Sequence, residues 1–137
     1  MLISTKGRYA LRIMIDLARH DKAEYVPLKE IAERQGMSEK YLEAIIKVLV
    51  TNKMVTGQRG KKGGYKLCKE PDEYTAWDII SAVENDFFAV SCLAPEAAAC
   101  ERAEHCATLP MWRDFNENLR QFFQKYTLEG LASQGEA

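Results

Sequence analysis

Apolar residues recur at helical spacing in the first third of the chain, and they predict three helices. Residues 5–20 carry one apolar stripe, formed by Tyr9, Ala10, Ile13, Met14 and Leu17. A short helix is expected over residues 28–35, because Pro27 favours a helix start and Gly36 a tight turn at its end. Ser38 is a favourable N-cap for a third helix that runs to about residue 52.

Two short extended segments follow, residues 54–58 and 65–68, on either side of a glycine-rich basic loop. Strand, glycine-rich loop and strand together predict a β-hairpin. Cys68 lies in the second of these strands, where we expect it to be a small core residue. Beyond the hairpin, Thr75 and Asp78 predict a capping box for a helix through about residue 85.

The last long helix is expected over residues 108–126, after a segment that has no apolar period. Its apolar residues alternate steps of three and four, as they do in coiled coils. This seam comprises Trp112, Phe115, Leu119, Phe122 and Tyr126. A lone C-terminal helix has little of its own domain to pack against, so we expect the seam to pair with a second copy of the chain. Thr127 is expected to cap a final turn through Leu131.

These elements predict a mainly α fold with a small β-hairpin wing, that is, a winged helix-turn-helix followed by a long C-terminal dimerisation helix. We expect a DNA-binding domain over residues 1–86, a cysteine-bearing loop over 87–107, and the dimerisation helix with its tail over 108–137. A chain of 137 residues, 47% of them apolar, is long enough for one small domain and an appended element.

The net charge of −1 hides two oppositely charged halves. Residues 1–68 hold fourteen Lys and Arg against seven Asp and Glu, a net charge of +7, whereas residues 69–137 hold five against thirteen, a net charge of −8. The basic half is suited to a phosphate backbone. No apolar run approaches the ~20 residues that span a membrane, and the first residues have no signal-peptide layout, so we expect a cytoplasmic protein without membrane contact.

Double-stranded DNA is the partner that the helix-turn-helix and hairpin predict. The N-terminal residues of the third helix are candidates for reading base edges in the major groove. These are Ser38, Glu39, Lys40, Tyr41 and Glu43. The wing loop is suited to the electronegative minor groove. Its candidates are Arg59, Gly60, Lys61 and Lys62. The alternative is a three-helix core with a solvated hairpin, but the turn glycine, the N-cap, the hairpin and the charge excess together favour DNA binding.

Three cysteines, Cys92, Cys100 and Cys106, lie within fifteen residues, with seven residues between the first pair and five between the second. In a reducing compartment, thiols grouped in this way favour a soft metal centre or thiol–disulfide chemistry over a structural disulfide. Incidental cysteines and a metal-free thiol switch are the alternatives, and a small redox metalloprotein with a basic docking face is a third. The chain lacks G-x-G-x-x-G, H-E-x-x-H and G-x-S-x-G, so we predict that it is not an enzyme.

Several segments resemble the family of the iron–sulfur cluster regulator IscR. They are residues 4–11 (STKGRYAL), 31–35 (IAERQ), 38–43, 59–65 (RGKKGGY), 79–83 (IISAV) and 112–113 (WR). The family includes the nitric-oxide-sensing regulator NsrR and the cysteine-metabolism regulator CymR. The resemblance implies a dimeric bacterial winged-helix transcription factor, most often a repressor, that senses iron–sulfur status, redox state or nitric oxide. In cluster-binding members three cysteines hold the centre, and they correspond to the three cysteines here; CymR-like members lack them.

The chain departs from this family at the fourth cluster ligand. IscR-like members have a histidine where this chain has Leu109, and NsrR-like members have an aspartate where it has Arg8. The resemblance therefore implies an iron–sulfur cluster but leaves [2Fe–2S] and [4Fe–4S] both open. His105 is the nearest residue of a known ligand type, and carboxylates from Glu101, Glu104 or the partner subunit's Glu43 are the next candidates for the fourth ligand.

Overall fold

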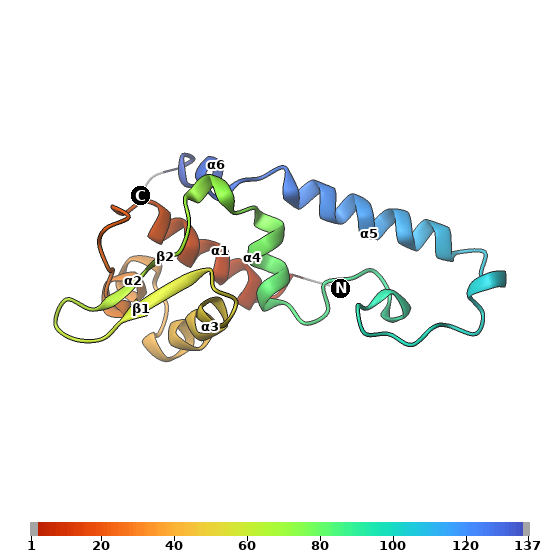
Figure 1. Ribbon diagram of the computed structural model, residues 1–137, viewed down its shortest axis with the longest axis horizontal. Helices are drawn as coiled ribbons and strands as arrows, with labels where there is room; N and C mark the ends of the chain where they lie inside the picture. The colour runs from red at the N-terminus through yellow and green to blue at the C-terminus, as the bar shows by residue number, and fades with distance from the viewer. Residues whose placement is uncertain (1–2, 136–137) are drawn as a thin grey trace.

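The computed structural model describes residues 3–135, which form a winged-helix body from which one long helix extends (Figure 1). The helices are α1 (Thr5–Ala18), α2 (Leu28–Gln35), α3 (Glu39–Thr51), α4 (Ala76–Val83), α5 (Leu109–Gln124) and α6 (Leu128–Ala132). The strands are β1 (Val55–Gln58) and β2 (Gly64–Leu67), and the short 3-10 turns are η1 (Pro71–Glu73), η2 (Ser91–Leu93) and η3 (Ala103–His105). The predicted mainly α fold with a hairpin wing is confirmed.

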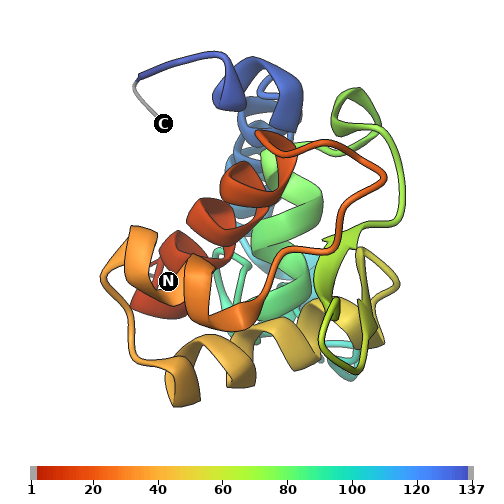
Figure 2. The ribbon, with the colours of Figure 1, turned by 90° about the vertical axis from the view of Figure 1, so that its left-hand side faces the viewer.

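The core lies where α1, α3 and α4 meet, and α1 and α4 run side by side above α3 (Figure 2). Each helix contributes apolar side chains to it, with Ile13 from α1, Ile46 from α3 and Ile79 from α4 fully buried. Within residues 3–135 no helix is long and apolar enough to cross a membrane.

The wing is an antiparallel hairpin in which Val55 pairs with Leu67. A third short segment extends it, because Val26 and Tyr65 exchange backbone hydrogen bonds of 2.8 and 2.9 Å. Gly64 adopts a φ of 145°, and a Cβ there would clash with the backbone of Val26, so only glycine fits. The wing is thereby held against the body at its base.

Helix α1 begins against the end of α4. The Glu84 carboxylate oxygen Oε1 accepts hydrogen bonds from Ser4 N (2.9 Å), Ser4 Oγ (2.7 Å) and Gly7 N (3.1 Å). An anion at this position also interacts favourably with the positive end of the helix dipole. Because Glu84 has an extended backbone that aims its side chain at α1, α4 ends at Val83, two residues before the predicted end.

The last helix returns to the body after α5. Leu128 is fully buried in the same core as α1, and its amide donates to the carbonyl of Tyr74 at 2.9 Å. The predicted cap is confirmed, since Thr127 accepts from the amide of Gly130 at 3.0 Å. The C-terminal segment therefore adds a packed element to the winged-helix body as well as the long helix.

The expectation for Cys68 was wrong. Strand β2 ends at Leu67, which pairs with Val55, so Cys68 lies just beyond the strand, where it is exposed. Its amide donates to the hydroxyl of Tyr74 and to the carbonyl of Met54, each at 3.1 Å.

Candidate nucleic-acid interface and cysteine loop

The turn between α2 and α3 has the geometry that its sequence predicts. Gly36 adopts the left-handed conformation at φ 64°, which ends α2. Ser38 then caps α3, its hydroxyl accepting from the amide of Tyr41 at 3.2 Å. All the residues predicted to read base edges are exposed on the first turns of α3, and they are Ser38, Glu39, Lys40, Tyr41 and Glu43. The start of α3 therefore presents these side chains to solvent.

A buried carboxylate fixes α2 against α1. Asp16 is 4% exposed, and its two oxygens accept from Arg34 Nε (3.0 Å), Arg34 Nη2 (2.9 Å) and Gln35 Nε2 (2.9 Å). The hydrogen bonds to Asp16 raise the pKa of the Arg34 guanidinium above its ordinary value, against the effect of desolvation. The ring of His20 lies 3.7 Å from the same carboxylate. The orientation of the helix-turn-helix thus depends on one polar network.

Two aromatic residues extend the exposed face of α3 onto α1, which sequence reasoning missed. Tyr9 and Tyr41 meet edge to face with their ring centroids 5.6 Å apart, and the Arg12 guanidinium lies 5.1 Å from the Tyr9 ring centroid. Tyr9 had been assigned only to the apolar stripe of its helix. Arg8 and Arg12, one turn apart on α1, were the signal that this helix also presents a basic face.

The wing tip presents its cations to solvent. The predicted residues Arg59, Gly60, Lys61 and Lys62 are all exposed. Gly60 has a φ of 109°, and a Cβ on Gly63 would clash with the backbone of Gln58 and Arg59, so glycines shape the tip. Among the residues that the structure describes, no acidic group forms an ion pair with the three cations. Their charge therefore remains available to an anionic partner.

The cysteine loop, residues 84–108, joins α4 to α5 at the end of the molecule away from the wing (Figure 1). Cys92 and Cys100 are exposed, Cys106 is half-buried, and all three are free thiols. Hydrogen bonds from the Thr108 side chain, 3.5 Å from the sulfur, and then from the backbone at the start of α5 lower the pKa of the Cys106 thiol.

The structure does not gather these thiols into a metal site. Within residues 3–135, no group of three or more His, Cys, Asp or Glu side chains is arranged to hold a metal ion. His105 is exposed in η3, directly before Cys106, while Glu43 lies on α3 in the winged-helix body and pairs with Lys47 at 3.6 Å. The donor chemistry fits an iron–sulfur cluster, since the loop carries three free thiols and the pKa of one of them is lowered.

Helix α5 has one packed face and one open face. On the packed face, Phe123 meets Phe87 with ring centroids 5.7 Å apart, and Asn116 Oδ1 accepts from the amide of Ala89 at 2.5 Å. The helix therefore has more of its own domain to pack against than its sequence indicated. The open face keeps large apolar side chains in solvent, with exposed fractions of 52% for Met111, 45% for Phe115, 49% for Phe122 and 41% for Tyr126. Trp112 and Leu119 of the predicted seam are half-buried.

Comparison with known proteins gives one consistent answer. Residues 3–134 match the model of the Rrf2 family, described as an iron-dependent transcriptional regulator. The chain is 38% identical over 136 residues to the HTH-type transcriptional regulator IscR of Pectobacterium atrosepticum, covering 99% of this chain and 82% of that protein. The same regulator of Photorhabdus laumondii is 37% identical over 136 residues, which cover 99% of this chain and 82% of that protein.

Solved structures agree with this result. CymR, the global cysteine regulator of B. subtilis, is 38% identical and superposes with a TM-score of 0.78 over 99% of both chains. IscR of T. potens is 31% identical, with a TM-score of 0.75 over 100% of this chain and 94% of that one. Both structures share the arrangement of helices and wing described above.

Proposed function

The chain belongs to the Rrf2 family of transcriptional regulators, and we propose that it is a dimeric, cytoplasmic repressor whose DNA affinity responds to an iron–sulfur cluster in its cysteine loop. The observation that carries this proposal is the exposed start of α3 beside a wing whose cations have no acidic partner among the described residues. We propose the segments 1–86, 87–107 and 108–137 for DNA binding, sensing and dimerisation. Membership in a family of transcriptional regulators argues against a redox carrier and against an enzyme.

DNA binding follows from shape and charge. The start of α3 can enter the major groove, where Lys40, Tyr41 and Glu43 reach base edges and Ser38 and Glu39 border the backbone. The wing places Arg59 at the minor groove, with Gly60 allowing close approach and Lys61 and Lys62 beside phosphates. Tyr9 and Arg12 are added as candidate backbone contacts, because they adjoin Tyr41.

Cys92, Cys100 and Cys106 would hold the cluster, with His105 or the partner subunit's Glu43 as the fourth ligand. A bound iron–sulfur cluster supplies redox and nitric-oxide reactivity to the protein. Support comes from the IscR relatives and from the lowered pKa of the Cys106 thiol, because thiolates are the form that ligates iron. Both [2Fe–2S] and [4Fe–4S] clusters suit this donor set.

A metal-free thiol sensor is the second candidate, and one observation favours it. Within residues 3–135 the three thiols are not grouped into a metal site. In this case oxidation of exposed Cys92 or Cys100 to a sulfenic acid or disulfide would be the signal.

Dimerisation through the open face of α5 accounts for its exposed apolar side chains. A two-fold pair also places two recognition helices about one turn of DNA apart, which suits a palindromic operator. The cysteine loop leads directly into α5, so closing the loop around a cluster can change the spacing of the two α3 helices. A different DNA affinity in the two states is the requirement for such control.

Anaerobic purification, followed by an iron and sulfide assay and a visible spectrum, decides between the two sensors. We expect iron and sulfide in stoichiometric amounts, and loss of both in Cys92→Ser, Cys100→Ser and Cys106→Ser. A colourless protein without iron or sulfide, which reconstitution does not change, would favour the thiol sensor.

Titration with duplex operator candidates tests DNA binding in both the loaded and the apo protein. Arg59→Ala should weaken specific binding by about 1–3 kcal/mol, and affinity should fall steeply with salt as counterions are released. Lys125→Ala, which removes an exposed charge at the end of α5, is the matched control and should bind as the wild type does. Absence of specific duplex binding in both states would refute the proposal.

A further inference from the structure

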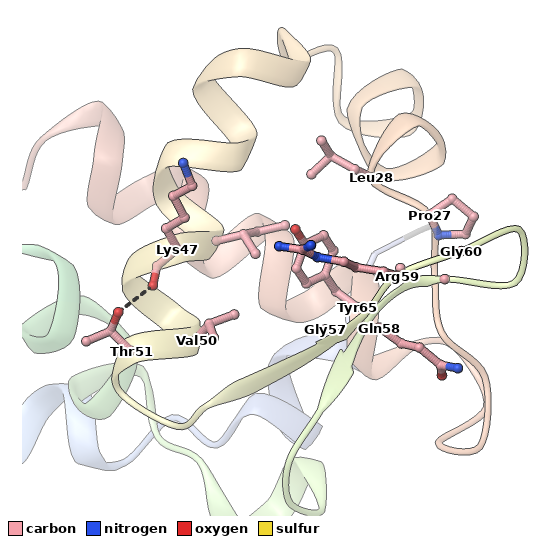
Figure 3. Close-up of a pocket in the computed structure, with 13 residues that line it drawn as sticks. Pro27, Leu28, Lys47, Val50, Thr51, Gly57, Gln58, Arg59, Gly60 and Tyr65 are labelled. Carbon is pink, nitrogen blue, oxygen red and sulfur yellow. Dashed lines mark hydrogen bonds between the residues drawn. The ribbon is translucent and has the colours of Figure 1, made fainter.

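A groove of roughly 740 Å³ lies between the C-terminal half of α3 and the wing (Figure 3). Its walls are apolar, and they come from the start of α2, from α3 and from β2. The wall residues are Leu28, Ile46, Val50 and Tyr65. Val50 is 39% exposed, whereas Ile46, one turn earlier on the same helix, is fully buried. The groove therefore offers apolar surface that the fold itself leaves uncovered.

The walls are held in place by the fold. Ile46 is fully buried at its base, and the backbone of Tyr65 is fixed by two hydrogen bonds to Val26. Thr51, on the last turn of α3, bonds its hydroxyl to the carbonyl of Lys47 at 2.9 Å. A concave apolar surface of this size, formed before any ligand arrives, is typical of small-molecule sites.

The groove is positively charged. Arg59 and Lys47 line it from opposite sides, and no Asp or Glu is among its lining residues within residues 3–135. Figure 3 shows the Arg59 side chain directed from the wing toward α3, along the groove rather than away from the body. In the part of the chain that the structure describes, Arg59 has no ion-pair partner, and Lys47 pairs only with Glu43 of its own helix at 3.6 Å.

We propose that this groove binds a small amphipathic anion, namely an aliphatic or aromatic carboxylate. The apolar body packs on Val50, Leu28 and Tyr65, and Arg59 holds the carboxylate in charge-assisted hydrogen bonds with Lys47 nearby. A bare phosphate would satisfy the cations but leave the apolar walls in water. The combination of walls and charge therefore selects an anion with an apolar body.

Such a ligand competes with DNA, because Arg59 cannot hold a carboxylate in the groove and reach the minor groove at once. This competition rests on the proposed function, whereas binding of the anion does not. By linkage, the ligand and the duplex must weaken each other's binding by the same factor. The groove would thus give the regulator an input that is independent of the cysteine loop.

Fluorescence titration of the full chain with 8-anilinonaphthalene-1-sulfonate, without DNA, tests the site directly. We expect two carboxylates to displace the dye, the aliphatic octanoate and the aromatic phenylacetate. Sodium phosphate at equal ionic strength should not displace it. Arg59→Ala should weaken octanoate binding about tenfold or more, since a hydrogen bond to a charged group is lost. Val50→Asp, which adds a negative charge to the wall, should abolish binding, and Lys125→Ala should leave it unchanged.

Failure of both acids to displace the dye, or equal displacement by phosphate, would overturn the proposal. So would wild-type affinity for octanoate in both groove variants, with far-ultraviolet circular dichroism confirming that they are folded. The DNA arm is separate: octanoate binding in a protein that binds no duplex refutes the proposed function and leaves the site standing. Octanoate binding that does not weaken duplex binding refutes the competition.

Discussion

Replacing Arg34 with alanine should destabilise the protein more than replacing its partner Asp16. The reason is an asymmetry in burial, because Asp16 is 4% exposed whereas the Arg34 side chain is 38% exposed. Arg34→Ala leaves a carboxylate inside the protein with Gln35 as its hydrogen-bond donor and the His20 ring 3.7 Å away. Asp16→Ala leaves a guanidinium that reaches water and still lies 3.5 Å from Glu30. The two variants remove the same contact, but one leaves a buried charge without its ion-pair partner and the other leaves a charge that water can solvate.

The expected losses in the free energy of unfolding follow from the charge that each variant leaves unpaired. Breaking a buried ion pair from the side that leaves a charge unpaired costs about 3–5 kcal/mol. Because Gln35 keeps one hydrogen bond and water can enter where the Arg34 side chain was, we expect a loss of about 2–4 kcal/mol for Arg34→Ala. Loss of hydrogen bonds without an unpaired buried charge costs about 1–2 kcal/mol, which is the expectation for Asp16→Ala. The stability loss of the double variant should be smaller than the sum of the two single losses, by about 1 kcal/mol or more.

Urea denaturation followed by circular dichroism at one fixed protein concentration measures these differences, since stability depends on concentration in a dimer. Lys29→Ala, which changes an exposed cation on the same helix, is the control and should stay within about 0.5 kcal/mol of the wild type. An equal loss in the two single variants, or a larger loss in Asp16→Ala, would show that the buried carboxylate does not organise this network.

Three further changes test other parts of the structure. Gly7→Ala places a Cβ against the Glu84 carboxylate and should cost about 1–2 kcal/mol in urea denaturation, with Glu84→Ala adding little to it; additive losses would contradict the contact. Tyr74→Phe removes a hydroxyl that donates to the Met54 carbonyl at 2.7 Å and should cost about 1–2 kcal/mol. Burial raises the pKa of Tyr74, so its hydroxyl stays protonated to a higher pH in the native state than in the unfolded chain. Stability should therefore fall above about pH 10 in the wild type, and this part of the fall should be missing in the phenylalanine variant. Leu119→Asp places a charge in the predicted seam of α5, where Leu119 is half-buried, and should give a smaller or aggregated species in light scattering, whereas a wild type that is already monomeric at micromolar concentration would refute the dimer.

Local signals in the sequence determined the elements of this fold. Gly36, Ser38 and the Thr75–Asp78 capping box act within one helical turn, and each appears in the structure where the sequence placed it. The exposed start of α3 and the wing tip were also predictable, because a cap and a glycine-rich basic loop each define their own surroundings. These signals depend on neighbours in the chain, so they can be read without knowing the fold.

The contacts that orient those elements were decided only by the tertiary structure. Asp16 reaches Arg34 across 18 residues, and Glu84 reaches Ser4 across 80, and neither pair has a periodic or short-range signature. The groove between α3 and the wing likewise depends on how two separate elements are placed. The positions of Cys92, Cys100 and Cys106 were also decided only by the tertiary structure. They lie on an irregular loop, which lacks the regular backbone hydrogen bonds that would place side chains according to their spacing in the sequence.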